Sequence, residues 1–211
     1  MPALAFLVFA LAAQQPAGTS IPLNTAPTMR SAQLGDRTSG DAAPAARFAD
    51  IPNVAIIYYD VAGNDIPEIH KAVAKAAPRE PETNRILPAT SKWSVAVKAR
   101  STTTGGRCRI DAVTLDFRGE AVMPRLAVTK DVPPPVVAAW KAFVAQLEAR
   151  QAAQLRFAYE RIGEIEQAVR GARCDRAEAA ADAARARLQE RQRADVAEDS
   201  RAQPKLELPK D

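Results

Sequence analysis

The hydrophobic pattern in the middle of the chain predicts a small β-sheet. Four segments are predicted as strands: 54–61, 93–98, 108–117 and 121–128. The first is β-branched and aromatic and lies between Pro52 and Gly63, while the second and third alternate apolar and polar residues. Gly105 and Gly106 indicate a turn before the third strand, and Pro124 makes the fourth an edge or bulged strand. Because the links are short, we expect an antiparallel meander.

Helical periodicity surrounds these strands. A short helix is predicted after Asp65, which can cap it, with Pro67 in its first turn. A long helix is predicted from Pro133 to Arg170, ended by Gly171, and an alanine-rich charged helix follows over 175–197. Two helices joined by a short link should pair antiparallel. The predicted fold class is therefore α+β, with an antiparallel sheet of about four strands packed on a long helix. The second, C-terminal helix would complete a helical hairpin.

The ends of the chain have a different composition. Residues 1–13 contain a short apolar run with an Ala-x-Ala site, typical of a secretory signal peptide that is cleaved on export. Residues 14–52 are rich in Pro, Ala, Ser and Thr without periodicity, which predicts a disordered linker. The folded domain is expected over 53–200, and 201–211 should be a disordered tail. The alternative for residues 1–13 is an apolar, unstructured N-terminus without a signal function.

Charge and composition exclude several function classes. The net charge is +4 and basic residues are interspersed with acidic ones, so a nucleic-acid interface is not expected. No glycine-rich phosphate loop and no nucleophile elbow are present. The single histidine, His70, leaves little from which to build a zinc site. No catalytic residue, metal or cofactor is predicted, and no integral membrane segment is expected after removal of the signal.

The two cysteines suggest a disulfide. In an exported chain, Cys108 on a strand and Cys174 at a helix junction are expected to bond, which would tie the helical pair to the sheet. The alternative is two reduced thiols in a cytosolic chain. We expect periplasmic or secreted localisation, and this expectation favours the disulfide over free thiols.

A set of short motifs resembles a known bacterial family. The motifs that carry the likeness are Tyr58-Tyr59-Asp60-Val61-x-Gly63, Trp93-x-Val95, Cys108 after a glycine pair, Pro124, Trp140-x-x-Phe143-x-x-x-Leu147 and Cys174 after the long helix. In this order and spacing the chain resembles a domain-of-unknown-function family described as predicted secreted zinc-dependent proteases. The resemblance implies a metallopeptidase whose long helix carries a His-Glu-x-x-His motif.

The chain departs from that motif at each of its chemical positions. The matching segment reads Arg150-Gln151-Ala152-Ala153-Gln154. A guanidinium cannot ligate zinc, glutamine is a poor ligand, and the amide of Gln151 cannot act as the base that activates water. Two explanations stay open for the glutamines: a helix end that leaves them in solvent, or a polar pocket inherited without its metal.

Three functional hypotheses follow. The first is a non-catalytic, exported member of the family that acts as a binding or scaffolding domain for an unknown protein partner. The second is a peptidase or hydrolase that keeps activity through unrecognised ligands such as Glu148, Asp195 and His70, which should then converge near Arg150. The third is a helical interaction arm, which predicts an exposed apolar seam along Leu155, Ile162 and Val169. We favour the first, so enzymatic activity is not the expected role.

Overall fold

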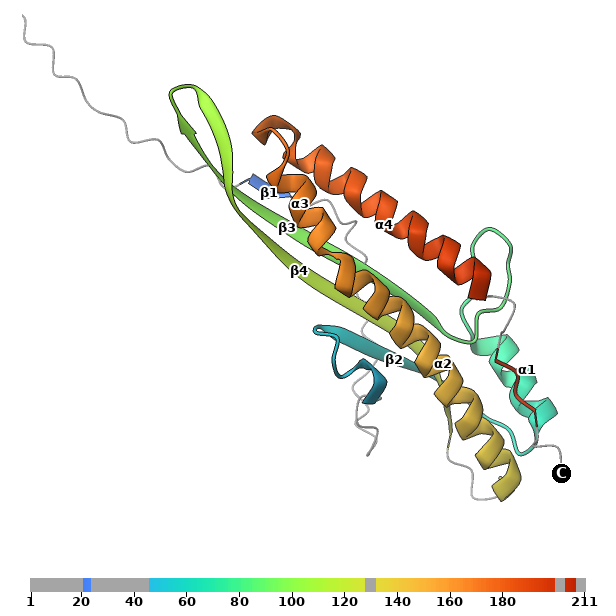
Figure 1. Ribbon diagram of the computed structural model, residues 1–211. Coiled ribbons are helices and arrows are strands. Elements are labelled where there is room, and N and C mark those ends of the chain that lie inside the picture. Colours follow the sequence, from blue (N-terminus) through green and yellow to red (C-terminus); the bar gives the residue numbers. More distant parts are fainter. Residues whose placement is uncertain (1–20, 24–45, 128–131, 200–203, 208–211) are drawn as a thin grey trace, which may run out of the picture.

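A computed structural model of the protein describes residues 21–23, 46–127, 132–199 and 204–207. The predicted signal peptide over 1–13 lies outside these residues. Helices cover one face of a long, narrow sheet (Figure 1). The strands are β1 (Ile21–Leu23), β2 (Val54–Val61), β3 (Thr90–Thr104) and β4 (Arg107–Leu126). The helices are α1 (Ile66–Ala76), α2 (Pro134–Arg161), α3 (Gly163–Arg170) and α4 (Ala177–Asp199), with 3-10 turns at Ala46–Phe48 and Cys174–Arg176.

The sheet is mixed, which corrects the predicted antiparallel meander of four strands. The folded domain contributes three strands, because the segments predicted as 108–117 and 121–128 form the single strand β4. β3 and β4 are antiparallel, whereas β2 pairs parallel with β4. The short β1, from the predicted linker, pairs with β3 and gives the order β1-β3-β4-β2.

Gly119 lies between the two segments predicted as separate strands, and its packing explains why β4 continues through it without a turn. A Cβ atom at this position would lie 3.0 Å from Val54 Cγ2 and 3.3 Å from Leu155 Cδ1, so the glycine lets β2 and α2 pack closely on the strand. The turn predicted at Gly105 and Gly106 is confirmed, and their φ angles of 57° and 78° suit a tight β-hairpin with a type I′ turn.

Pro124 lies inside β4 without disrupting the sheet. The last β3 partner of β4 is Val122, so Pro124 lies beyond the end of β3 and pairs only with Tyr59 of β2. Prolines are tolerated at such one-sided positions because a strand edge needs no donor there. The expected edge character therefore holds locally, although β4 is central in the strand order.

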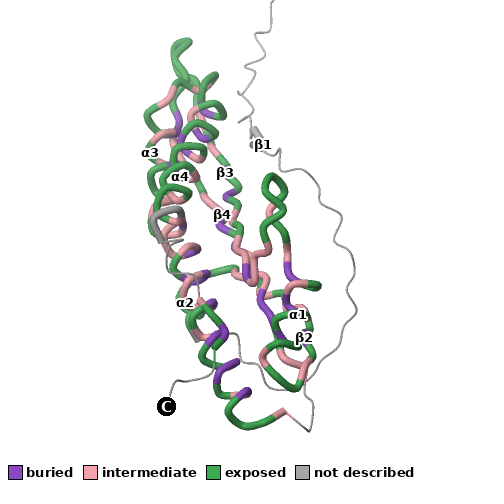
Figure 2. Tube along the Cα trace, turned by 90° about the vertical axis from the view of Figure 1, so that its right-hand side faces the viewer, coloured by how far each residue is buried: buried purple, intermediate pink, exposed green. Residues whose placement is uncertain are grey.

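The core lies between the sheet and the helices. Figure 2 shows the helical layer beside the sheet, with buried positions on the facing sides. The apolar stripe predicted for the long helix is largely buried: Trp140, Phe143, Leu147, Leu155, Ala158, Ile165 and Val169. Burial of Leu155 and Val169 removes the exposed seam that the interaction-arm hypothesis required, so that prediction is wrong.

The long helix is divided. α2 ends at Arg161, and α3 begins at Gly163 after a break at Ile162, so the prediction of one continuous helix to Arg170 is wrong. Glycine is a poor helix former and commonly marks a helix break, which agrees with a break beside Gly163. Gly171 ends α3 as predicted, with its N–H bonded to Gln167 O at 3.0 Å. α4 then returns along α3 and α2 and completes the C-terminal helical pair.

Packed structure extends beyond both predicted domain boundaries. Phe48 and Ile51, inside the predicted linker, are 3% and 4% exposed. At the other end, Leu206 is 3% exposed, and its carbonyl accepts a hydrogen bond from His70 Nε2–H at 3.0 Å. The described part of the tail is therefore docked on α1, which corrects the prediction of disorder for residues 204–207.

Candidate functional site

Cys108 and Cys174 form the predicted disulfide, with a Cα–Cα distance of 6.1 Å. The bond joins the end of the β3–β4 hairpin to the link between α3 and α4. Disulfides form and persist in oxidising compartments, so the bond is consistent with an extracellular location. Among the described residues, no helix is long and apolar enough to span a bilayer.

The three positions that the family resemblance aligns with a His-Glu-x-x-His motif lie at one cleft between α2, the start of β3 and the end of α4. Arg150, Gln151 and Gln154 line a cavity of about 220 Å³ together with residues 87–91. Arg150 and Gln154 also border a second depression, which Gln192 and Asp195 of α4 complete. The helical spacing predicted from sequence therefore brings these side chains to a single place.

Gln151 lies inside the core-facing stripe of α2. Leu147, Gln151 and Leu155 are spaced four residues apart and share one helical face. Gln151 is only 4% exposed, so the explanation that leaves it in solvent is wrong. Its Nε2 donates a long hydrogen bond of 3.5 Å to Ala89 O, whereas its Oε1 has no partner among the described residues. A buried polar atom without a partner costs roughly 1–3 kcal/mol of stability.

Gln154 has a fully connected environment instead. Its Oε1 accepts from Ser91 Oγ at 3.0 Å, and its backbone carbonyl accepts from Gln192 Nε2 at 2.9 Å. Gln192 Oε1 in turn accepts from the indole N–H of Trp93 at 2.6 Å. This chain of amides ties the end of α4 to α2 and β3.

Arg150 is half-buried and makes no ion pair with any described residue. Other arginines of α2 are engaged: Arg156 pairs with Asp50 at 2.8 Å, and Arg161 lies over the ring of Phe157. The hydrogen bonds from Arg156 hold the pKa of Asp50 below its usual range. The cleft therefore contains a permanent cation that pairs with no carboxylate among the described side chains.

The opposite wall of the cleft is a short loop held by polar contacts. Tyr59 OH donates to Pro88 O at 2.7 Å, and burial raises the pKa of this phenol. Glu80 accepts hydrogen bonds from Thr83 and Arg85, which lower the pKa of its carboxyl. Asn84 has a φ of 54° and its N–H bonds to Glu80 O, which closes the turn. Tyr59 of β2 therefore helps to hold this wall of the cleft in place.

A metal set built from the alternative ligands is not assembled. His70 of α1 is hydrogen-bonded to Leu206 of the tail, and Asp195 borders the outer depression. Glu148 lies near Tyr58, whose pKa is raised first by burial and then by the Glu148 carboxylate. Burial also raises the pKa of Glu148. Within the described ranges, no three His, Cys, Asp or Glu side chains are grouped to hold a metal ion.

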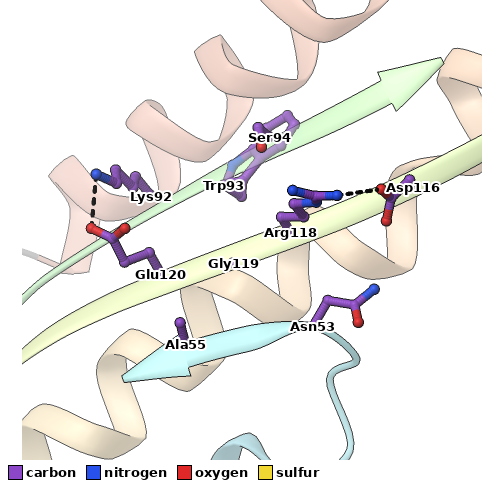
Figure 3. A pocket seen from close by; sticks show the side chains of 9 residues that line it. All are labelled: Asn53, Ala55, Lys92, Trp93, Ser94, Asp116, Arg118, Gly119 and Glu120. Carbon is purple, nitrogen blue, oxygen red and sulfur yellow. Dashed lines mark hydrogen bonds and ion pairs between the residues drawn. The ribbon is translucent and has the colours of Figure 1, made fainter. Parts of the chain in front are cut away.

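A more open depression of about 620 Å³ lies on the sheet face, lined by residues of β2, β3 and β4 (Figure 3). Its charged side chains neutralise one another: Lys92 pairs with Glu120 at 2.7 Å, and Arg118 with Asp116 at 3.1 Å. Because its charges are paired and exposed, this surface is a weaker site candidate than the cleft. Sequence reasoning did not single it out.

The fold and the cleft define a disulfide-bonded, mixed α+β domain with a polar cleft on its longest helix. Residues 56–201 match the family described as "Bacterial protein of unknown function (DUF922)". The match covers more than half of the chain, and the chain belongs to this family. No curated protein and no solved structure matches it.

Proposed function

We propose that the protein is a non-catalytic, exported member of its family that acts as a binding or scaffolding domain outside the cytoplasm. One observation carries the proposal: the positions that the resemblance aligns with a His-Glu-x-x-His motif hold a guanidinium and two amides, one of them buried in the core stripe. Arg150 would repel a zinc ion, and neither glutamine supplies an anionic ligand or a base. These residues do not fit a zinc ion.

The disulfide supports the exported part of the proposal, because the bond between Cys108 and Cys174 needs an oxidising environment to persist. Support for a binding role comes from the cleft, where a cavity lies beside a buried amide oxygen that has no partner among the described residues. The alternative peptidase would need ligands from other elements. The dispersed positions of Glu148, Asp195 and His70 do not favour it.

Metal content tests the proposal directly. The purified mature protein is incubated with excess zinc, desalted and analysed for bound metal, and we expect near-zero zinc per chain. A variant carrying Arg150→His, Gln151→Glu and Gln154→His provides the matched control. Two histidines four residues apart share one helical face, so this variant should bind zinc in a titration with a chromophoric indicator. Stoichiometric zinc in the natural protein would overturn the proposal, and a peptidase assay would follow.

A further inference from the structure

The cleft presents two unmet polar groups of opposite character. Arg150 offers a cation that no described carboxylate neutralises, and Gln151 Oε1 offers a buried acceptor without a donor. A ligand that satisfies both must bring an anion and an N–H group close to each other. The last residue of a peptide does so, because its carboxylate and its amide N–H are attached to the same Cα.

The remaining lining combines polar and apolar residues. Glu80 and Arg85 pair with each other, Thr90 and Ser91 are polar, and the apolar part consists of Leu87, Pro88, Leu147, Val196 and Pro204. The volume of about 220 Å³ is below the range of roughly 300–1,000 Å³ that encloses drug-sized ligands. The cavity is therefore sized for one residue, and its apolar wall favours an aliphatic one.

We propose that the cleft binds the free C-terminus of a peptide that ends in an aliphatic residue. Arg150 pairs with the terminal carboxylate, and Gln151 Oε1 accepts the N–H of the last residue. Arginine suits this role because its planar guanidinium can donate two parallel hydrogen bonds to a carboxylate. The inference rests on the proposed binding function and names its ligand class.

Gln151 must rotate to meet the ligand, because its Oε1 is covered in the structure. Among the described residues, the amide is held by one hydrogen bond, the 3.5 Å bond to Ala89 O, which is longer than a good hydrogen bond of about 2.9–3.0 Å. This long bond restrains the rotation only weakly. Inorganic phosphate could neutralise Arg150 but would leave Gln151 unsatisfied and the apolar wall exposed.

Calorimetric titration of the full, disulfide-bonded chain tests the proposal with two probes: N-acetyl-Ala-Ala-Leu with a free carboxylate, and the same peptide with a C-terminal amide. We expect the free acid to bind about tenfold or more tightly than the amide, as a charge-assisted pair implies. Arg150→Gln should abolish this preference, and Arg150→Lys should retain part of it. Gln151→Leu should weaken both peptides while keeping the preference.

Arg187→Gln is the matched control, because Arg187 lies on the exposed face of α4 outside the cleft. It should leave both affinities unchanged, and circular dichroism verifies that each variant is folded. Equal affinity for acid and amide, an acid preference that survives Arg150→Gln, or no binding at millimolar peptide would each overturn the inference. Zinc is measured in the same samples. A zinc-free chain that ignores both peptides refutes only this inference, whereas bound zinc refutes the proposed function itself.

Discussion

The two ends of the domain are built differently. At the disulfide end, the β3–β4 hairpin is joined covalently to the α3–α4 link, and Ile165 and Val169 are fully buried beside it. At the cleft end, the buried amide oxygen of Gln151 has no partner among the described residues, and Arg150 pairs with none of them. A cavity there lies between α2 and the loop before β3. Binding sites commonly give up local stability in this way. The difference indicates that one end maintains the fold while the other is available for function.

Loss of the disulfide should produce the largest effect. A variant with Cys108→Ser and Cys174→Ser opens a loop whose ends are 66 residues apart in sequence. In the chain-entropy model we expect a loss of about 4 kcal/mol in the free energy of unfolding. Urea denaturation measures it, and reductant should destabilise only the natural protein. An unchanged midpoint would mean that the disulfide end does not depend on its bond.

Truncation of the docked tail residue should have a smaller effect. Leu206→Ala removes a side chain that is 3% exposed and packs with α1. We expect a loss of about 2 kcal/mol, at the low end for a buried leucine, because the tail can detach locally. Hydrogen exchange of α1 amides should increase in the variant, and His70→Ala, which removes the bond to Leu206 O, should shift exchange in the same direction. Unaltered α1 protection in both variants would contradict the docking.

Gln151→Leu should stabilise the protein while it impairs peptide binding. The change removes an unsatisfied buried acceptor and extends the leucine stripe of α2, so we expect a gain of about 1 kcal/mol in denaturation experiments. The matched variant is Gln154→Leu, which should destabilise by about 1 kcal/mol because it leaves the hydroxyl of Ser91 unpaired. If both substitutions changed the free energy of unfolding in the same direction, the proposed difference between Gln151 and Gln154 would be contradicted.

The smallest effect concerns Glu148. Burial raises the pKa of its carboxyl above the ordinary value of 4.5, so the fold favours the protonated form. Its contribution to stability is therefore present at pH below about 4.5 and is lost as pH rises through the folded-state pKa. Glu148→Gln should raise the free energy of unfolding at pH 7, by less than Gln151→Leu does, and the difference should vanish near pH 4. A pH-independent difference between the two proteins would contradict this assignment.

Local sequence signals predicted the elements that depend on neighbouring residues. The bounds of β2 agree with the structure, and Asp65 caps α1 by accepting from Glu68 N–H at 2.8 Å. The turn at Gly105 and Gly106 was also predictable, because two consecutive positive φ angles favour glycine. The disulfide pairing could be predicted because the chain contains two cysteines.

Tertiary structure decided what depends on contacts between distant segments. Whether Gly119 turns the chain or makes room for Leu155 is set by the helix packed on it, so neither the length of β4 nor the parallel pairing of β2 was readable from the pattern. The docking of Leu206 depends on α1, more than a hundred residues away in sequence. For the cleft, the sequence alone determined which side chains stand at the motif positions. Only the fold decided that the amide oxygen of Gln151 is buried without a partner among the described residues, since the satisfaction of a buried polar group depends on every segment packed around it.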